Sequence, residues 1–442
     1  MTGKIKAYFF GSVFRRGATL LTFLTLGSYL LGLVRDIAFA RFFGASRLLD
    51  IYNSAFIIPD LLLNIFVAGA LTAAFVPVFS HLFAAGEKQE AEKVATTALY
   101  AAPLTIFVLG IPIFILMPYL ASLVAPGFSG QERQLLILMS RLMLLSPIIF
   151  AVSNTLGNIL ISFEKFGAYG LSPILYNLGI IAGIPLVKIF GPAGLVIGVI
   201  GGALLHLAIR SIGLIRSRFG LRFPVDFRNP HFLKIPKLML PRMAGQPIEQ
   251  VIFFIFNNMA STLVAGSIAI LSFARNFQSV PVSLFGISFS TAIFASLSRK
   301  AALGDRGGFQ HHLKEAAIVL AVMSGLSALV FLFFGETIIR VFFGGGRFTE
   351  QDVIRTGKLL SIFALAIPAE SFIHLIARSF YALKDTWTPL FVTLPGLVVI
   401  AIFAKKLIPL MALNALPFSF FIVLTAEVGI LTFILLKKLR RL

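Results

Sequence analysis

The chain has 442 residues, of which 58% are hydrophobic and only 13% charged, and its mean hydropathy is +0.95. A soluble domain is nearer half apolar and a quarter charged, so this composition excludes a soluble fold. The net charge of +20 fits the lysines and arginines of cytoplasmic loops in a membrane protein, so we do not expect nucleic acid as a partner. The absence of cysteine excludes disulfides and thiolate chemistry, and the six histidines lack the spacing of a metal site.

Apolar runs of spanning length recur along the whole chain, and each must be helical because lipid offers no partner for backbone polar groups. Residues 1–16 are basic and polar, and the apolar run after them predicts a retained first helix, not a cleaved signal peptide. The sequence thus predicts an all-α integral membrane protein of about twelve transmembrane helices. Their expected ranges are 18–34, 50–80, 94–118, 134–161, 172–190, 193–215, 238–263, 266–298, 314–335, 354–381, 387–408 and 412–436.

The basic residues fall in alternate loops, which predicts that both termini are cytoplasmic. Exceptions on the expected outer side are Lys405 with Lys406 and the cluster of Arg35, Arg41 and Arg47. The residues that set this orientation are Lys4, Lys6, Arg15, Arg16, Lys88, Lys93, the basic residues of 216–237, Arg299, Lys300, Arg306, Lys437, Lys438, Arg440 and Arg441.

Three short motifs recur at an offset of about 220 residues, half the length of the chain. Thr72 to Phe75 is repeated at Thr291 to Phe294, and 128–132 and 158–165 are repeated at 348–352 and 378–385. Ordered matches at one offset indicate two pseudo-symmetric six-helix lobes around a central cavity, as in transporters. We expect lobes at 1–215 and 238–442, joined by a basic cytoplasmic linker at 216–237.

Two arginines inside apolar spans are the main candidates for substrate binding. Arg35 lies at the outer end of the first helix beside Asp36, where the alternative is an ion pair or snorkelling to the interface. Arg275 lies deep in the eighth helix, with no acid one turn away, so it must face a cavity or a partner. Guanidinium groups bind phosphate oxygens bidentately, so one arginine from each lobe predicts an anion clamp between the lobes.

Several acids also lie within the spans. Glu370 and His374 are four residues apart on one helix face, where they could bind a coupling cation or relay protons, or merely tie helices together. Glu249 and Glu427 leave the same alternatives open. No catalytic constellation or phosphate-binding loop is present, so we expect no enzyme, no cofactor and no direct use of ATP, and energy from Na⁺, H⁺ or the membrane potential.

The chain resembles the lipid II flippase family (MurJ/MviN) of the multidrug/oligosaccharidyl-lipid/polysaccharide exporter superfamily. The resemblance is carried by 28–36, 40–45, Asp50, Pro59, 73–77, 125–128, 274–275, 346–349, 380–381 and 388–389. It implies two six-helix lobes in the bacterial inner membrane and alternating-access transfer of undecaprenyl-pyrophosphate-linked peptidoglycan precursor to the outer leaflet. It also implies that Arg35 and Arg275 bind the pyrophosphate, that Asp36, Arg41, Asp50 and Tyr29 belong to the cavity or its gate, and that cell-wall synthesis proteins are partners.

The sequence departs from the family pattern in the cavity and at its end. Tyr29 stands where the family usually has arginine, Leu63 replaces a basic residue and Ala68 replaces a glutamate. About twelve helices are expected here, whereas typical members carry two more that form a groove for the lipid tail, so we expect no such groove. Alternatives therefore stay open: an exporter of another polyprenyl-linked glycan, a cation-coupled drug exporter, or a non-transporting scaffold in cell-wall assembly. Arg35 and Arg275 disfavour the drug exporter, which should have acids in its cavity.

The charge alternation can be tested by cysteine labelling, because the chain has no cysteine of its own. A single Asp226→Cys substitution falls in the basic linker, which we expect on the cytoplasmic side. An impermeant thiol reagent added to intact cells should leave it unlabelled and should label it after the cells are opened. Labelling in intact cells would contradict the predicted topology.

Overall fold

The computed structural model describes residues 13–68, 70–217, 219–221, 223, 225–243 and 248–441. All regular elements in these ranges are helices, and their one β feature is an isolated bridge between Gly345 and Phe348. Within the same ranges, nine helical stretches are long and apolar enough to cross a membrane, or ten with the bent pair 350–382. The chain is therefore a multi-pass membrane protein, as predicted.

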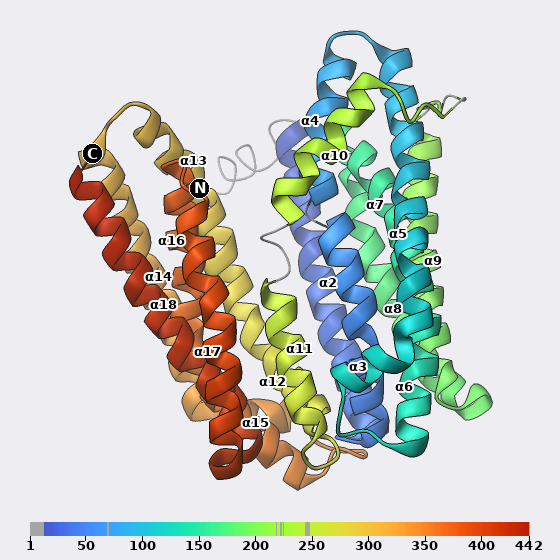
Figure 1. Cartoon of the computed structure of the whole chain (residues 1–442), viewed down its shortest axis with the longest axis vertical. Coiled ribbons are helices and arrows are strands. Elements are labelled where there is room, and N and C mark those ends of the chain that lie inside the picture. Colours follow the sequence, from blue (N-terminus) through green and yellow to red (C-terminus); the bar gives the residue numbers. More distant parts are fainter. Residues whose placement is uncertain are drawn as a thin grey trace, which may run out of the picture. The chain divides into compact units, whose positions relative to one another are not determined.

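By its contacts the chain forms two compact units, 1–42 with 51–250 and 43–50 with 251–442. The helices of the first unit run lengthwise along one another (Figure 1). They are α2 (Val13–Phe43), α3 (Arg47–Leu63), the π-helix η1 (Asn64–Ala68), α4 (Ala70–Ala84), α5 (Lys88–Val124), α6 (Gly130–Met143), α7 (Leu145–Ser162), α8 (Phe166–Phe190), α9 (Ala193–Arg216) and α10 (Pro230–Met243). Residues 43–50, which include the first turn of α3, belong to the second unit.

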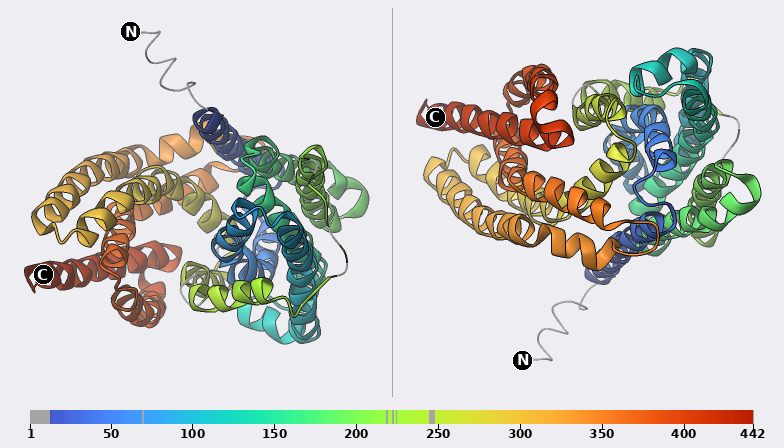
Figure 2. Two further views of the ribbon diagram at one scale, coloured as in Figure 1. Left: turned by 90° about the horizontal axis from the view of Figure 1, so that it is seen from above. Right: turned by 90° about the horizontal axis from the view of Figure 1, so that it is seen from below.

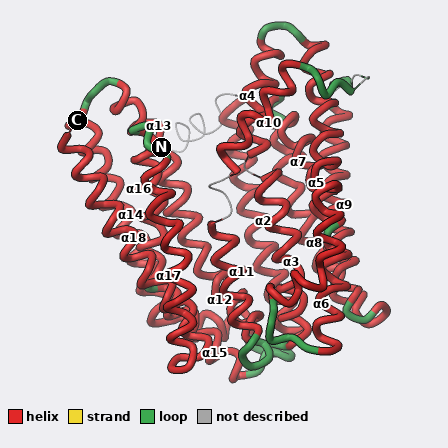
Figure 3. The backbone as a smooth tube through the Cα atoms, viewed as in Figure 1, coloured by secondary structure: helices red, strands yellow, loops and turns green. Residues whose placement is uncertain are grey.

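The second unit is a bundle of the same kind, in which α17 and α18 lie side by side (Figure 2). Its loops lie mostly at the helix ends, as in the first unit (Figure 3). Its helices are α11 (Ile248–Ser261), α12 (Ser267–Pro281), the π-helix η2 (Val282–Ile287), α13 (Ser288–Ala302), α14 (Arg306–Phe343), α15 (Glu350–Ala364), α16 (Ala366–Ala382), α17 (Trp387–Met411), the short η3 (Ala412–Asn414) and α18 (Ala415–Arg441).

The twelve-helix pattern expected from the sequence is confirmed, and several of the twelve are broken helices. The second is α3–η1–α4, the fourth α6–α7, the eighth α12–η2–α13 and the tenth α15–α16. The expected helix 238–263 falls on the end of α10 and on α11, and residues 244–247 between them lie outside the described residues. The second and eighth helices are interrupted by π-helical turns, which displace the backbone hydrogen-bond ladder locally, whereas the fourth and tenth turn at Leu144 and Leu365.

The internal repeat is visible in the backbone. The π-helices begin at Asn64 and Val282, and the broken helices turn at Leu144 and Leu365, so both features recur at the offset of the sequence motifs. Even two non-glycine residues in the left-handed region, Glu164 and Lys384, are related in this way. Such residues are strained unless their surroundings fix them, so their recurrence indicates two copies of one bundle. Further equivalent left-handed positions are Gly44 with Gly266, Gly86 with Gly304, and Gly191 with Ala412.

The structure also explains why one sequence motif recurs. In the first unit, the Thr72 hydroxyl on α4 donates to Asn158 Oδ1 on α7 at 2.8 Å. At the equivalent position of the second unit, Arg378 Nη2 on α16 donates to the Thr291 hydroxyl on α13, also at 2.8 Å. Each repeat therefore ties its second helix to its fourth through a threonine, because an interhelical hydrogen bond satisfies polar groups that lipid cannot.

Helices α8 and α9 are held close together by facing glycines. A β-carbon on Gly202 would lie 2.5 Å from the Tyr176 carbonyl oxygen, and one on Gly179 would lie 2.2 Å from the Gly202 Cα. A β-carbon on the neighbouring Gly201 would meet nothing within 4 Å. Small residues of this kind let two backbones approach and are a main source of helix association in membranes.

These neighbours provide a matched pair of substitutions. Gly202→Ala should lower the free energy of unfolding by about 1–3 kcal/mol, because its methyl group meets backbone that cannot move aside without separating the helices. Gly201→Ala should be neutral or slightly stabilising, because it meets open space. Thermal unfolding of the two variants in detergent measures the difference, and equal midpoints would contradict the close packing of α8 on α9.

Candidate functional site

Arg35 lies on α2 in the first unit, and its guanidinium is held by two neighbours. Nε and Nη2 donate to Asp36 Oδ1 at 3.0 and 2.8 Å, and Nη1 donates to Asn177 Oδ1 of α8 at 3.1 Å. The Arg35 side chain is 27% exposed. The ion pair with Asp36, which the sequence offered as an alternative to ligand binding, is present, and it orients the guanidinium.

Arg275 lies on α12 in the second unit and is almost fully buried. Its Nη1 and Nη2 donate to Glu370 Oε2 and Oε1 on α16 at 2.8 and 2.7 Å, which makes a bidentate ion pair. Nη1 also donates to Gln278 Oε1, and Gln278 Nε2 donates to Glu370 Oε2 at 2.8 Å. The guanidinium carbon lies over the rings of Phe253 and Phe420, 5.0 and 5.4 Å from their centroids.

This network gives Arg275 a partner that its own helix does not supply. The sequence left open whether Arg275 faces a cavity or a partner, and whether Glu370 binds a cation or ties helices together. Glu370 is the counter-ion of Arg275, because the packing of α12 on α16 joins residues that are 95 positions apart. His374 lies one turn further along α16 and is half-buried. The backbone carbonyl of His374 accepts a hydrogen bond from Arg378 Nη1 at 3.3 Å.

Asp50, in the first turn of α3, is completely buried within the second unit. Its Oδ2 accepts from the Gly266 amide at 2.6 Å and its Oδ1 from the Ala269 amide at 2.9 Å, so it caps the N-terminus of α12. A carboxylate is favoured there by the free amides and the helix dipole. The expected cavity acid therefore does not face open space in this structure; it anchors the helix that carries Arg275.

The remaining residues expected at the cavity or gate differ in how exposed they are. Asp36 is buried beside Arg35, whereas Arg41 is exposed. Tyr29, at the family's arginine position, is also exposed, at 55%. Arg47 makes an ion pair with Asp50 at 3.6 Å. In the first unit, Tyr29, Asp36 and Arg41 thus share α2 with Arg35.

A third buried arginine was not recognised from the sequence. Arg210 on α9 falls at the end of the expected helix 193–215, and it is only 3% exposed. It donates to Ser172 Oγ on α8 and to the Ser153 carbonyl and Asn154 Oδ1 on α7, at 2.8–3.0 Å, and it stacks on Tyr169. The available signal was its position within the apolar run 193–215. Asn177 and Gln278 were also missed, because an amide in a helix has no distinctive spacing.

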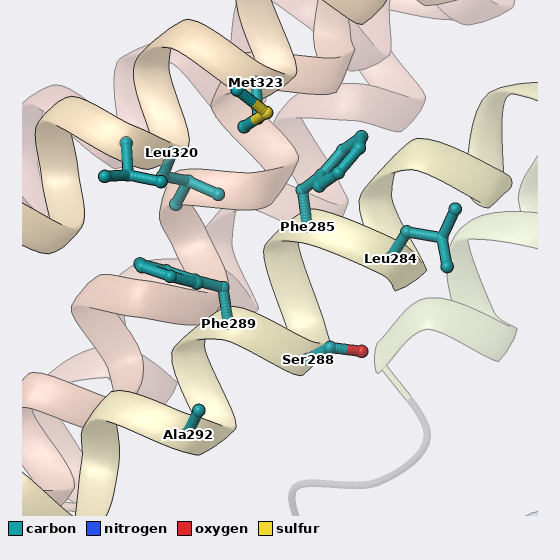
Figure 4. Close-up of a pocket in the computed structure, with 8 residues that line it drawn as sticks. Leu284, Phe285, Ser288, Phe289, Ala292, Leu320 and Met323 are labelled. Atoms are coloured by element: carbon teal, nitrogen blue, oxygen red, sulfur yellow. The ribbon is translucent and has the colours of Figure 1, made fainter. Parts of the chain in front are cut away.

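A pocket of about 260 Å³ opens between α14 and the η2–α13 segment of the second unit. Figure 4 shows Phe285, Phe289 and Leu320 around it, with Ser288 as the one polar side chain of its lining. It contains no charged group, so it does not suit a pyrophosphate. The candidate anion-binding side chains are Arg35 within the first unit and Arg275 within the second.

Comparisons with known proteins identify the family. Residues 39–442 match the profile of the family described as lipid II flippase MurJ, a range that includes Arg275 and begins just after Arg35. The chain is 28% identical over 397 residues to a probable lipid II flippase MurJ of Rickettsia prowazekii, covering 88% of this chain and 77% of that protein. It is also 28% identical over 375 residues to a probable lipid II flippase MurJ of Thermotoga maritima, covering 84% and 74%.

Solved structures agree with this assignment. The fold matches a lipid II flippase MurJ in an inward closed conformation with a TM-score of 0.77 and 28% identity, covering 94% of this chain and 87% of that one. An inward-facing multidrug resistance transporter of the MATE family matches with a TM-score of 0.78 at 15% identity, covering 96% and 98%, which shows a shared fold only. On the match of its sequence over residues 39–442, the chain belongs to the lipid II flippase MurJ family.

Proposed function

We propose that this protein is a lipid II flippase, which moves undecaprenyl-pyrophosphate-linked peptidoglycan precursor from the inner to the outer leaflet of the bacterial cytoplasmic membrane by alternating access. The observation that carries the proposal is the family match over residues 39–442. The membrane-spanning helices supply the environment that such a substrate needs. Both termini lie in the cytoplasm, as the charge alternation predicts.

The headgroup of this substrate would be bound through its pyrophosphate by Arg35 and Arg275. Guanidinium is planar and permanently charged, and it binds phosphate oxygens through two parallel hydrogen bonds. Arg35 is supported by Asp36 and Asn177, so its direction is set before a ligand arrives. Such preorganisation reduces the entropy lost on binding.

Arg275 would bind the pyrophosphate by exchanging partners. Both of its Nη groups are engaged by Glu370. A phosphate oxygen pair has the same fork geometry as a carboxylate, so it can replace Glu370 on the guanidinium. Glu370 then acts as an internal anion that keeps a buried cation neutralised while the substrate is absent. A cation or proton held by Glu370 with His374 would favour this exchange. In this way Glu370 and His374 could couple ion binding to substrate binding.

Substitution of the two arginines tests the substrate site. A hydrogen bond to a charged group contributes about 1.5–3 kcal/mol, so Arg35→Ala or Arg275→Ala should weaken binding of an undecaprenyl-pyrophosphate headgroup roughly 10- to 150-fold. Both variants should also abolish translocation in proteoliposomes. Arg275→Lys should be impaired, because lysine keeps the charge and loses the fork. Tyr29→Arg should tighten binding by restoring the family's arginine on exposed α2 surface.

Lys358→Ala is the matched control, because it removes an exposed cation from α15 and should leave binding and transport intact. Expression level and unfolding midpoint are measured for every variant. Translocation at the wild-type rate in both alanine variants would rule out pyrophosphate binding by these arginines.

The exchange at Arg275 makes a separate prediction for Glu370 and His374. Glu370→Gln removes the competing anion, so the headgroup should bind more tightly, while the free protein should lose about 3–5 kcal/mol of stability because Arg275 is left without its counter-ion. His374→Ala should retain binding and change the dependence of transport on Na⁺ or pH. Headgroup titration and transport assays measure both. Unchanged affinity and unchanged ion dependence would reduce the two residues to ties between helices.

A further inference from the structure

Glu427 is another buried acid in the second unit, and it lacks the partners that Glu370 has. It lies midway along α18 and is 7% exposed. Among the described residues it makes no hydrogen bond and no ion pair, and no charged side chain acts on it. Its neighbours on the same helix are apolar, including the buried Val423, Leu424 and Leu431.

The carboxyl group lies directly against α17, where the chain has a glycine. A β-carbon on Gly396 would fall 1.7 Å from Glu427 Oε1, so the carboxyl group fills the space that any side chain at that position would occupy. The Val423 side chain lies 3.5 Å from the same point. The contact between α17 and α18 is therefore built around an acid that has no hydrogen-bonding partner in the part of the chain that the structure describes.

The charged groups of the surrounding helices are engaged elsewhere or lie away from this position. Glu370 is bound by Arg275 and Gln278, and Arg378 donates to Thr291. None of the titratable side chains on α15, α16 and α17, the long helices with the most contacts to α18, interacts with Glu427. These side chains are Glu350, Asp352, Arg355 and Lys358 of α15, Glu370, His374, Arg378 and Tyr381 of α16, and Lys405 and Lys406 of α17.

An ionised carboxylate in such surroundings would be unstable. Burial of an unpaired charge is so costly that the group neutralises instead, and within a membrane-spanning helix water cannot compensate. The neutral acid fits against the Gly396 backbone, whereas the carboxylate needs water or a cation. We propose that Glu427 is a proton-binding site whose protonated form closes the contact between α17 and α18, and whose deprotonation opens it.

The role of this proton site in transport rests on the proposed function, because a proton-binding site inside a transporter can couple proton movement to substrate movement. Release of the proton to water leaves a carboxylate, which must reach an aqueous environment through movement of α18 relative to α17. Proton binding and helix packing in the second unit would thereby depend on each other, as linkage requires. The site is distinct from Glu370, whose charge is already balanced by Arg275.

Infrared difference spectroscopy tests the protonation directly. The full-length protein and Glu427→Gln are reconstituted in liposomes and compared over a pH series. The wild type should show the C=O stretch of a protonated carboxyl group at neutral pH, which is missing in the variant and lost as the pH rises. Glu315→Gln is the control, because Glu315 is exposed and should contribute only carboxylate bands at neutral pH. Carboxylate bands from Glu427 at neutral pH would overturn the proposal.

Two further measurements separate this site from the transport proposal. Gly396→Ala should push the carboxyl group toward water, so its protonated band should disappear at lower pH than in the wild type; an unchanged band would contradict the contact with Gly396. The rate of lipid II translocation should vary with pH in the wild type, and Glu427→Gln should lose that variation. If the translocation rate of Glu427→Gln varies with pH as it does in the wild type, the coupling role is overturned. Wild-type protein that translocates nothing at any pH, yet shows the protonated band, would refute the transport function and leave the proton site standing.

Discussion

The cost of an unpaired charge inside the membrane is the constraint on which the rest of this structure depends. Arg275 is neutralised by Glu370 from a helix distant in sequence, and Arg35 is partly neutralised by its neighbour Asp36. Arg210 has neutral partners instead, but these come from two other helices and include the face of an aromatic ring. Each buried cation thus fixes the packing of several helices. Arg35 and Arg275 differ in exposure, because the Arg35 side chain is 27% exposed whereas that of Arg275 is 8% exposed.

The duplicated architecture places these charges in equivalent bundles without making the bundles identical. Broken helices, π-helical turns and left-handed residues recur at one offset, so the backbone retains the ancestral repeat. The side chains have diverged: Asn158 accepts from a threonine where Arg378 donates to one. The second bundle alone holds the network of Arg275, Gln278 and Glu370. A transporter built in this way can bind one substrate with two dissimilar half-sites, provided each half-site is stable when empty.

The fold was largely predictable from sequence, because helix number follows from the length of apolar runs and lobe structure follows from internal repeats. The functional pairs were not. Glu370 and His374 share a helix face, so local periodicity suggested that pair, whereas the contact of Glu370 with Arg275 depends on helix packing. Asp50 was recognised as a functional position, but its capping of α12 joins residues more than 200 positions apart. Arg210 was not recognised, because positive charge near a helix end is usually a topology signal. Pairwise contacts of this range leave no trace in a single sequence.

Genetic complementation is the most direct test of whether this chain moves lipid II. A bacterium whose own lipid II flippase can be depleted would express this chain, with Arg275→Ala as the inactive counterpart and membrane levels of both proteins measured. The account predicts that the wild-type chain restores growth and cell shape and that the variant does not. Failure of the well-expressed wild-type chain to restore growth, together with no transfer of lipid II in proteoliposomes, would contradict the assigned function. Restoration by the Arg275→Ala variant would contradict the proposed substrate site.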